Sequence, residues 1–460
     1  MPQRPNILYL HSHDTGRYIA PYGYAVHTPN LQKLAERGML FRHAFTANPT
    51  CSPSRACLLT SRCAHNNGML GLAHRGSALS DPAQTLPSYL HGHGYETVLT
   101  GVQHVARHDV PASDYGYSRD VRHEPTPDFT GAGVNDQQTV HRVEQFLKGW
   151  NADKPLFLDV GFFTTHRTGT TPEGVQWHNG PESPAGDPRD VRPPACLPDT
   201  AETRADFADY AVAVTRLDDY MGRVLDALDQ AGLAENTLII CTTDHGIAFP
   251  HMKCNLTDHG LGVMLTLAGP AGNGQRFDGG CVSDSLVSQI DLFPTVCDAV
   301  GLDKPDSLQG VSLSPLAADE HAKVRDEVFA EVNYHAAHEP KRAVRTDRYK
   351  YIRRVTVREH PVLPNCDPGV SKDLLLAQGW RQRPQEAERL YDLAYDPQET
   401  CNRIDDPAYA EAAQQMRDKL EQWMRDTNDP ALTGKVHLPG YQINPADGMH
   451  PGQDDLVTER

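Results

Sequence analysis

The chain has 460 residues, enough for more than one hydrophobic core, so we expect one large domain with a smaller one attached. Its 43 Lys and Arg residues and 60 Asp and Glu residues give a formal net charge of −17, which argues against binding nucleic acid or an anionic membrane through bulk charge. Ten cysteines in a chain of this length do not suggest the disulfide framework of a small secreted domain, and no CxxC pair suggests structural zinc. An apolar run begins within five residues of the first one, which leaves no room for a signal peptide, and no later run is long enough to span a bilayer. We therefore expect a cytoplasmic chain with reduced cysteines.

Helical and strand-like patterns alternate along the first half of the chain. The apolar run 6–10 predicts a strand, and Thr28, Pro29 and Gly38 mark the N-cap, first turn and end of a helix. The alternation continues with helices at 86–94, 140–150 and 207–228 and strands at 95–100, 155–163 and 237–243. This order predicts an α/β fold whose mainly parallel sheet is sandwiched by helices. Residues 166–200 lack a sustained period and are rich in Gly, Pro and Asp, which predicts a long surface loop bordering a substrate site.

The pattern changes in the last quarter of the chain. Short strand candidates occur at 349–355 and 389–393, and a final helix opens at Asp406. One face of that helix carries Tyr409, Met416, Leu420 and Trp423. We therefore expect a catalytic α/β domain at 1–345 and a smaller C-terminal α+β domain with short antiparallel strands at 346–460.

Two predicted strands run into histidine and aspartate in the same way. The first is followed by His11, His13 and Asp14, and a later one by Asp244 and His245. Because ligands of an open parallel sheet bind beyond the carboxyl ends of its strands, these residues could meet there and hold a divalent metal ion. Oxygen ligands alone would suit calcium or magnesium, whereas imidazoles favour manganese, iron or zinc. The alternative is that each aspartate caps a turn and each histidine is an ordinary polar residue.

The segment around Cys51 offers a second candidate for chemistry. Cys51 stands just before a predicted helix, where exposed amides and the helix dipole favour an anion. Arg55, four residues on, could bind an oxyanion in a bidentate way. By these arguments alone, Cys51 is either an activated thiolate or a buried cysteine at the start of a helix.

The same segment, Cys51-Ser-Pro-Ser-Arg55, matches the C-x-P-x-R core of the sulfatase signature, whose cysteine is oxidised to formylglycine by a dedicated enzyme. The order of the other motifs also resembles this family: Asp14, the G-x-x-H motif ending at His104, His166, Asp244-His245 and Lys253. The segments VSQIDLFPTV and RAVRTDRYKYI look like the sulfamidase branch, the heparan N-sulfatases and their bacterial relatives. The resemblance covers nearly the whole chain and implies the sulfatase fold of the alkaline phosphatase superfamily.

Carried over position by position, the resemblance implies roles for individual residues. The metal ligands would be Asp14, Asp244, His245 and the modified Cys51, with His13 as a further candidate. Arg55 would steady the formylglycine, while Lys253, His104 and His166 would contact the sulfate or assist the leaving group. Calcium is the metal that the family implies, and manganese or zinc are compatible with the imidazoles. The implied partners are a small anionic sulfated substrate and a formylglycine-generating or equivalent maturation enzyme, and a homo-oligomer is left open.

Three positions depart from the family pattern. His13 stands where most sulfatases have the first of two aspartates, His245 where many have asparagine, and Val102 where a lysine usually stands. Because that lysine is missing, we expect His104 to protonate the departing group. His335, His338 and Arg342 either line a substrate pocket or are merely solvated.

The sequence therefore predicts a sulfuric ester hydrolase that cleaves sulfate esters, aryl esters included, or sulfamates. His245 also resembles its counterpart in the phosphonate monoester hydrolases, which gives a phosphonate or phosphodiester hydrolase as the alternative. A third hypothesis, motivated by Val102, is a silent relative that binds a sulfated ligand without turnover. The set of charged groups argues against it, because a silent site has no reason to keep Arg55 and Lys253.

Overall fold

The computed structural model describes residues 4–124, 126, 135–151, 153–171, 174–177, 186–452 and 456–459. Its central sheet has the strand order β12-β2-β10-β9-β1-β6-β4-β5, with β11 paired to β10. The strands are β1 (Asn6–Ser12), β2 (Met39–Phe41), β4 (Glu96–Gly101), β5 (Arg119–Asp120), β6 (Leu156–Phe162), β9 (Thr237–Thr243), β10 (Leu265–Gly272), β11 (Gln275–Phe277) and β12 (Cys281–Ser283). All neighbouring pairs from β9 to β5 are parallel, whereas β10 is antiparallel to both β9 and β2. The prediction of a mainly parallel sheet is confirmed.

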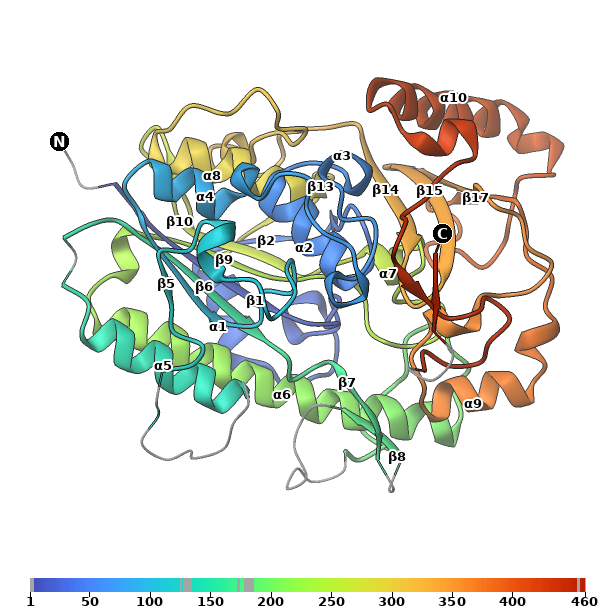
Figure 1. The fold of residues 1–460 in the computed structure, drawn as a ribbon, viewed down its shortest axis with the longest axis horizontal. Helices are drawn as coiled ribbons and strands as arrows, with labels where there is room; N and C mark the ends of the chain where they lie inside the picture. The colour runs from blue at the N-terminus through green and yellow to red at the C-terminus, as the bar shows by residue number, and fades with distance from the viewer. Residues whose placement is uncertain are drawn as a thin grey trace.

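Helices cover both faces of this sheet, and β1 shows why (Figure 1). One face packs on α1 (Pro29–Arg37), α5 (Asp136–Lys148) and α6 (Ala201–Gln230), and the other on α2 (Cys51–Thr60), α4 (Leu86–Gly92) and α8 (Leu292–Val300). Leu8 and Leu10 of β1 belong to the first core, whereas Ile7 and Tyr9 belong to the second. Because successive side chains of a strand point to opposite faces and both faces are covered, the middle of β1, Ile7–Leu10, is a continuous apolar run.

A second, antiparallel sheet lies beside the first, with the strand order β14-β15-β16-β17. Its strands are β14 (Glu327–Tyr334), β15 (His338–Thr346), β16 (Tyr349–Arg354) and β17 (Glu388–Asp392), and α9 (Val370–Ala377) and α10 (Ala410–Asp426) accompany it. The expected boundary at residue 345 falls inside β15, because this sheet already begins at Glu327. The division into domains otherwise stays a prediction.

Helix α10 carries the expected apolar face, one turn later than predicted. A short 3-10 turn, Pro407–Tyr409, precedes it, and Met416, Leu420 and Met424 are buried against the second sheet. Trp423 stacks on Phe329 with ring centroids 5.0 Å apart.

The expected loop at 166–200 contains a hairpin instead, formed by β7 (Arg167–Thr171) and β8 (Gly174–Trp177). Arg167 pairs with Asp206 of α6 at 2.7 Å and lies 4.0 Å from the centre of the Trp177 ring. These long-range contacts fix the hairpin, so a local period could not reveal it. The part of the expected loop at 178–185 lies outside the described residues.

Shorter elements complete the described chain: β3 (Ala44–Phe45), β13 (Val287–Ser288), β18 (Gln442–Ile443), β19 (Val457–Thr458), α3 (Ala64–Asn67) and α7 (Asp258–Leu261). None of the helices within the described ranges is both long and apolar enough to cross a membrane.

We predict that Arg342→Met destabilises the fold by about 3–5 kcal/mol. Arg342 is fully buried and lies 2.8 Å from Asp429 and 3.5 Å from Glu331, so its loss takes a cation from two buried carboxylates, of which Glu331 keeps His65 at 2.9 Å. Urea unfolding followed by tryptophan fluorescence measures the change. The control is Arg42→Met, whose pair with Asp284 is exposed on both sides and should cost less than about 1 kcal/mol. Equal losses in the two variants would contradict the prediction.

Candidate active site

The two aspartates predicted to meet do so at the carboxyl ends of adjacent strands. β1 and β9 pair in parallel with Ser12 opposite Thr243, so the residues that follow each strand come out side by side. The backbone N–H of Asp14 donates to Asp244 Oδ1 at 2.8 Å. Asp14 itself has a left-handed backbone (φ 48°), which turns its side chain back toward the end of β9. The structure therefore brings both carboxylates, buried, to one point.

Cys51 approaches this point from the opposite side as the first residue of α2. Its helix is locked onto β9 because Ser54 Oγ donates to the carbonyl of Asp244 at 2.6 Å. His245 Nε2 lies 3.4 Å from Cys51 Sγ. Burial acts to raise the pKa of the Cys51 thiol, but the charges of Lys253 and His245 outweigh it and hold that pKa well below its usual value.

Lys253 supplies the positive charge closest to Asp14. Its Nζ lies 2.9 Å from Asp14 Oδ2 and 3.0 Å from Asp367 Oδ2. Burial acts to lower the pKa of this ammonium, yet the two carboxylates raise it well above its usual value. Lys253 is therefore a fixed cation, and Asp367, which precedes α9, is its second anchor.

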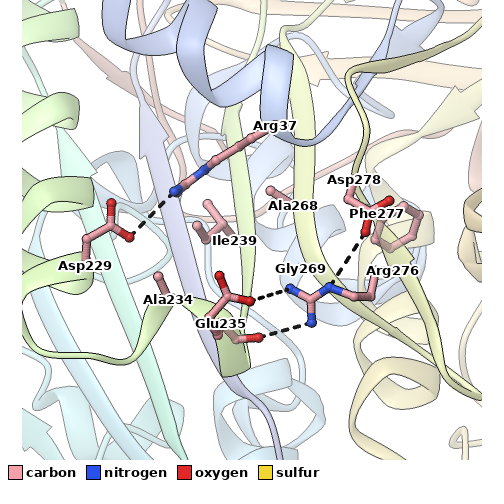
Figure 2. A pocket seen from close by; sticks show the side chains of 10 residues that line it. All are labelled: Arg37, Asp229, Ala234, Glu235, Ile239, Ala268, Gly269, Arg276, Phe277 and Asp278. Atoms are coloured by element: carbon pink, nitrogen blue, oxygen red, sulfur yellow. Dashed lines mark hydrogen bonds and ion pairs between the residues drawn. The ribbon is translucent and has the colours of Figure 1, made fainter.

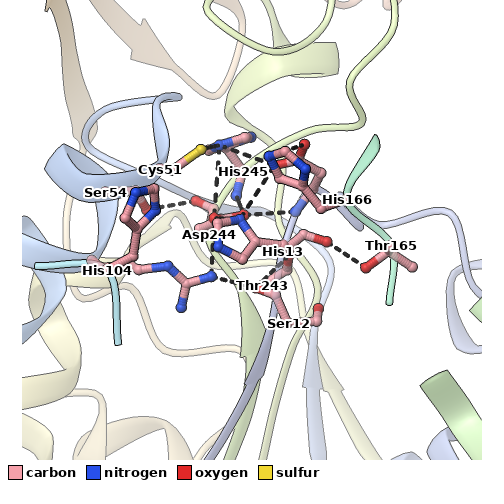
Figure 3. A network of polar contacts seen from close by, with 12 residues as sticks. Ser12, His13, Cys51, Ser54, His104, Thr165, His166, Thr243, Asp244 and His245 are labelled. Carbon is pink, nitrogen blue, oxygen red and sulfur yellow. Dashed lines mark hydrogen bonds and ion pairs between the residues drawn. The ribbon is translucent and has the colours of Figure 1, made fainter. Parts of the chain in front are cut away.

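Histidines surround Cys51, as Figure 3 shows for His13, His104, His166 and His245. His13 Nδ1 lies 3.0 Å from Asp244 Oδ2. The ring of His104 lies 5.5 Å from that of His13 and 3.1 Å, atom to atom, from His74. His166 Nε2 lies 3.9 Å from Asp14 Oδ2, and its side chain keeps 28% of its surface exposed.

His104 and His335 both lie near the thiol within the protein. Burial lowers the pKa of each imidazole and outweighs the opposing effect of the neighbouring Cys51. His104 also has a left-handed backbone (φ 53°), which directs it from the end of β4 toward α2. A lowered pKa favours the neutral imidazole, which accepts protons, and the expected role of His104 as the leaving-group acid stays a prediction. His166, at the opening, is a second candidate for that acid.

The donor set fits a divalent cation. Two groups each bring their ligand atoms within 4.8 Å of one another: His13, Asp14, Cys51 and His166, and Asp14, Cys51, Asp244 and His245. His13 Nε2 and Asp14 Oδ1 are buried and have no hydrogen-bond partner among the residues that the structure describes. Such atoms are costly unless something satisfies them, and a cation coordinated by carboxylate and imidazole would do so. The mixed donors do not select one metal.

Several residues that the sequence brought forward lie elsewhere. His11 does not point toward the two aspartates, because its Nε2 lies 2.7 Å from Asp159 of the neighbouring strand β6. His338 stacks on Tyr334, and Arg342 belongs to the buried ion pair described above, so of that trio only His335 reaches the centre. Val102 is buried and brings no charge to the place of the usual lysine.

Sequence reasoning missed Asp367 and His74. Asp367 follows no strand that the sequence predicted, and nothing in its neighbourhood marks it as functional. His74 lies in a short 3-10 turn after α3, and its only signal was its place in a segment, GLAHRG, that resembles the family.

A separate pocket of about 270 Å³ lies away from this centre, near the start of β9 (Figure 2). Its cations are already paired, Arg37 with Asp229 at 3.6 Å and Arg276 with Glu235 and Asp278 at 3.8 Å each. It therefore offers an anion no free positive charge.

Comparison with known proteins assigns the chain to a family. A model of the sulfatase family matches residues 5–302, and a model of the C-terminal region of N-sulphoglucosamine sulphohydrolase matches residues 271–365. The chain belongs to the sulfatase family. The N-sulphoglucosamine sulphohydrolase of Homo sapiens is 33% identical, over 92% of this chain and 91% of its own. This confirms the family resemblance, including its sulfamidase branch.

Solved structures confirm the sulfatase fold. A sulfatase of Bacteroides fragilis superposes with a TM-score of 0.73 at 20% identity, covering 94% of this chain and 97% of its own. A phosphonate monoester hydrolase from Silicibacter pomeroyi gives a TM-score of 0.64 at 18% identity, covering 100% and 99%. The fold is thus shared with a second chemistry, while family membership makes this protein a sulfuric ester hydrolase. Sulfatases generally depend on a metal ion and formylglycine, and the structure contains a group able to hold a metal.

We predict that Asp14→Ala and Asp244→Ala each lose the metal and the activity together. Both carboxylates are buried at the convergence of β1 and β9, and no other acid can replace either without moving a strand end. Metal content measured by mass spectrometry on the same preparations as turnover tests this. Asp284→Ala, which alters an exposed carboxylate, is the control and should keep both. A stoichiometric metal in Asp244→Ala would show that the site lies elsewhere.

Proposed function

We propose that this sulfatase hydrolyses the sulfamate of N-sulfated glucosamine, through a formylglycine made from Cys51 and one divalent metal ion. The observation that carries the proposal is the fixed cation Lys253 beside a buried Cys51 with a depressed thiol pKa. That arrangement forms a local anion site in a protein of net charge −17. The identity to the human sulphohydrolase across almost the full length supports the nitrogen-linked sulfate as the bond cleaved.

The metal would be held by Asp14, Asp244, His245 and the residue formed from Cys51, with His13 beside them. When bound, it supplies positive charge that polarises the S–O bonds and lowers the pKa of an attached hydroxyl. Calcium is the family's expectation, and the imidazoles leave room for manganese or zinc. An imidazole must be neutral to bind a cation. The two buried aspartates raise the pKa of His245 to about 9 against the effect of burial. A bound cation would therefore take the place of a proton on His245.

In the first step, one hydroxyl of the hydrated formylglycine passes its proton to solvent water and attacks sulfur, and the S–N bond breaks. Lys253 holds a sulfate oxygen, and its ammonium cannot drift because Asp14 and Asp367 fix it from two sides. The departing nitrogen takes its bonding pair and a proton, which His166 donates from the opening of the site. The products are the free amine and a sulfate ester of the formylglycine hydrate.

In the second step, His104 takes the proton of the other hydroxyl. The C–O bond to sulfate then breaks, sulfate leaves with that electron pair, and the aldehyde is restored. Water adds to it and completes the cycle. A serine or cysteine at position 51 has no second hydroxyl, so its ester could not collapse in this way.

Phosphonate or phosphodiester hydrolysis is the second candidate function. The observation that favours it is His245, which contacts both Asp14 and Cys51 where many sulfatases have an asparagine. Parallel assays of sulfamate, sulfate ester and phosphonate model substrates on metal-replete, modified enzyme separate the two. We expect sulfamate turnover to lead, and a faster phosphonate reaction would reverse the assignment. Cytoplasmic location, the maturation enzyme and oligomeric state stay predictions.

We predict that Cys51→Ser and Cys51→Ala both abolish turnover and leave the fold intact. The side chain at 51 is small and begins a helix, so neither change opens a large cavity. Peptide mass analysis of active wild-type protein should find formylglycine at this position. Full activity in a preparation that contains only unmodified cysteine would refute the proposed nucleophile.

We predict different leaving-group dependence for two histidine variants. His166→Ala should slow sulfamates and alkyl sulfates about 100-fold more than activated aryl sulfates, because only poor leaving groups need a proton in the transition state. His104→Ala should slow all of them by similar factors, since the collapse of the sulfated hydrate is common to all. A series of substrates with graded leaving-group acidity measures this. The opposite pattern would return the acid to His104.

A further inference from the structure

A chain of buried polar groups extends from Arg55 along the face of the sheet that α2 covers, across β1 and β6. Arg55 is 2% exposed and uses NH2 twice, at 2.9 Å to the carbonyl of Ser12 and at 3.1 Å to Asp244 Oδ2. Its NH1 contacts His11 Nδ1. His11 Nε2 lies 2.7 Å from Asp159 Oδ1, and Tyr117 donates its hydroxyl to Asp159 Oδ2 at 2.5 Å.

The direction of every hydrogen bond in this chain is fixed by chemistry. A guanidinium only donates, so His11 Nδ1 must accept from Arg55. The ring proton therefore sits on Nε2 and is donated to Asp159, whose other oxygen accepts from Tyr117. Asp159 holds one tautomer of His11, and that tautomer presents a lone pair to Arg55.

The protein makes room for this imidazole at the expense of a side chain. Gly161 of β6 lies opposite His11 in the register of β1 and β6, and a β-carbon there would stand 2.5 Å from His11 Cε1. Tyr9 stacks on the other side of the ring, with centroids 4.3 Å apart. The ring is therefore clamped within the sheet.

Two N–H groups of Arg55 remain, the second one of NH1 and the Nε–H. Its Nε–H is buried and has no partner within the described residues. Cys51 and Arg55 stand four residues apart on α2, so they share one helix face. With NH1 and NH2 held by the ends of β1 and β9, the guanidinium cannot rotate to satisfy Nε elsewhere.

We infer that His11 is a positioning residue for the reaction, which orients Arg55 so that its Nε–H serves the residue at 51, with Asp159 and Tyr117 behind it. The inference rests on the proposed function only for what Arg55 does. An imidazole suits this place because its Nδ1 accepts a hydrogen bond from the guanidinium and so fixes its orientation. The ring also separates the charge of Asp159 from Arg55. Asp244 already contacts the guanidinium at 3.1 Å, so a second carboxylate in direct contact would cancel the positive charge that an anionic substrate needs.

Two substitutions of His11 test the inference as a matched pair. In His11→Asn the amide oxygen stands near the place of Nδ1 and can accept from Arg55, whereas in His11→Gln the amide stands near Nε2 and keeps only the side toward Asp159. We expect kcat to fall about 10-fold or more in the glutamine variant with little change in KM, and within about 3-fold of wild type in the asparagine variant. Metal content and conversion of Cys51 should stay at the wild-type level in both.

A double-mutant cycle shows through which residue His11 acts. In an Arg55→Lys background, His11→Gln should add little further loss, because the guanidinium that it orients is already gone. Tyr117→Phe should lower kcat by a smaller factor. Tyr95→Phe is its control, since that buried hydroxyl donates to Pro5 and touches no member of the chain.

Equal losses of kcat in the asparagine and glutamine variants, or full additivity with Arg55→Lys, would overturn the inference. Crystal structures of the two variants separate this failure from a failure of the proposed function, because they report the guanidinium orientation without turnover. We expect that orientation to be kept in His11→Asn and lost in His11→Gln. An unchanged guanidinium in His11→Gln would also overturn the inference, even if wild-type enzyme hydrolyses no sulfated substrate.

Discussion

The parallel pairing of β1 with β9 is the constraint on which the rest of the structure depends. It places Asp14 and Asp244 in contact inside the protein, where two carboxylates repel each other and neither is solvated. Such a pair is tolerable only among compensating cations. Lys253 and Arg55 provide that charge, one for each aspartate. The positive charges that would bind a sulfate are therefore also the charges that allow these two strand ends to pack together.

The second sheet completes the centre as well as covering it. His335 follows β14 and reaches Cys51, while Asp367 precedes α9 and holds Lys253. Neither comes from the strand ends that an open parallel sheet usually supplies. The catalytic cation is therefore anchored jointly by β1 and by a segment beyond β16, so the two parts of the chain cannot separate without releasing Lys253.

Local pattern was enough to predict β1, β4, β6 and β9 of the first sheet and the residues at their ends, but not β2, β5, β10, β11 or β12. Strand β9 was placed at its observed bounds, and α1 between its proline and glycine, because apolar period and caps are local properties. Cys51, Asp14 and Lys253 were found because a motif carries them. The hairpin at β7, the beginning of the second sheet at Glu327 and the second anchor Asp367 were not predicted. Each depends on contacts between residues distant in sequence, which leave no local period.

Two residues of the site must meet two requirements at once, one of chemistry and one of backbone conformation. Asp14 and His104 need particular chemistry, yet both also stand in left-handed backbone, which disfavours most side chains. Aspartate, asparagine, histidine and glycine tolerate that conformation best, and only some of them can ligate a cation or move a proton. Few substitutions at these two positions can therefore satisfy both the backbone and the chemistry. A descendant carrying a branched or bulky residue at either would have had to rebuild the turn as well as the chemistry.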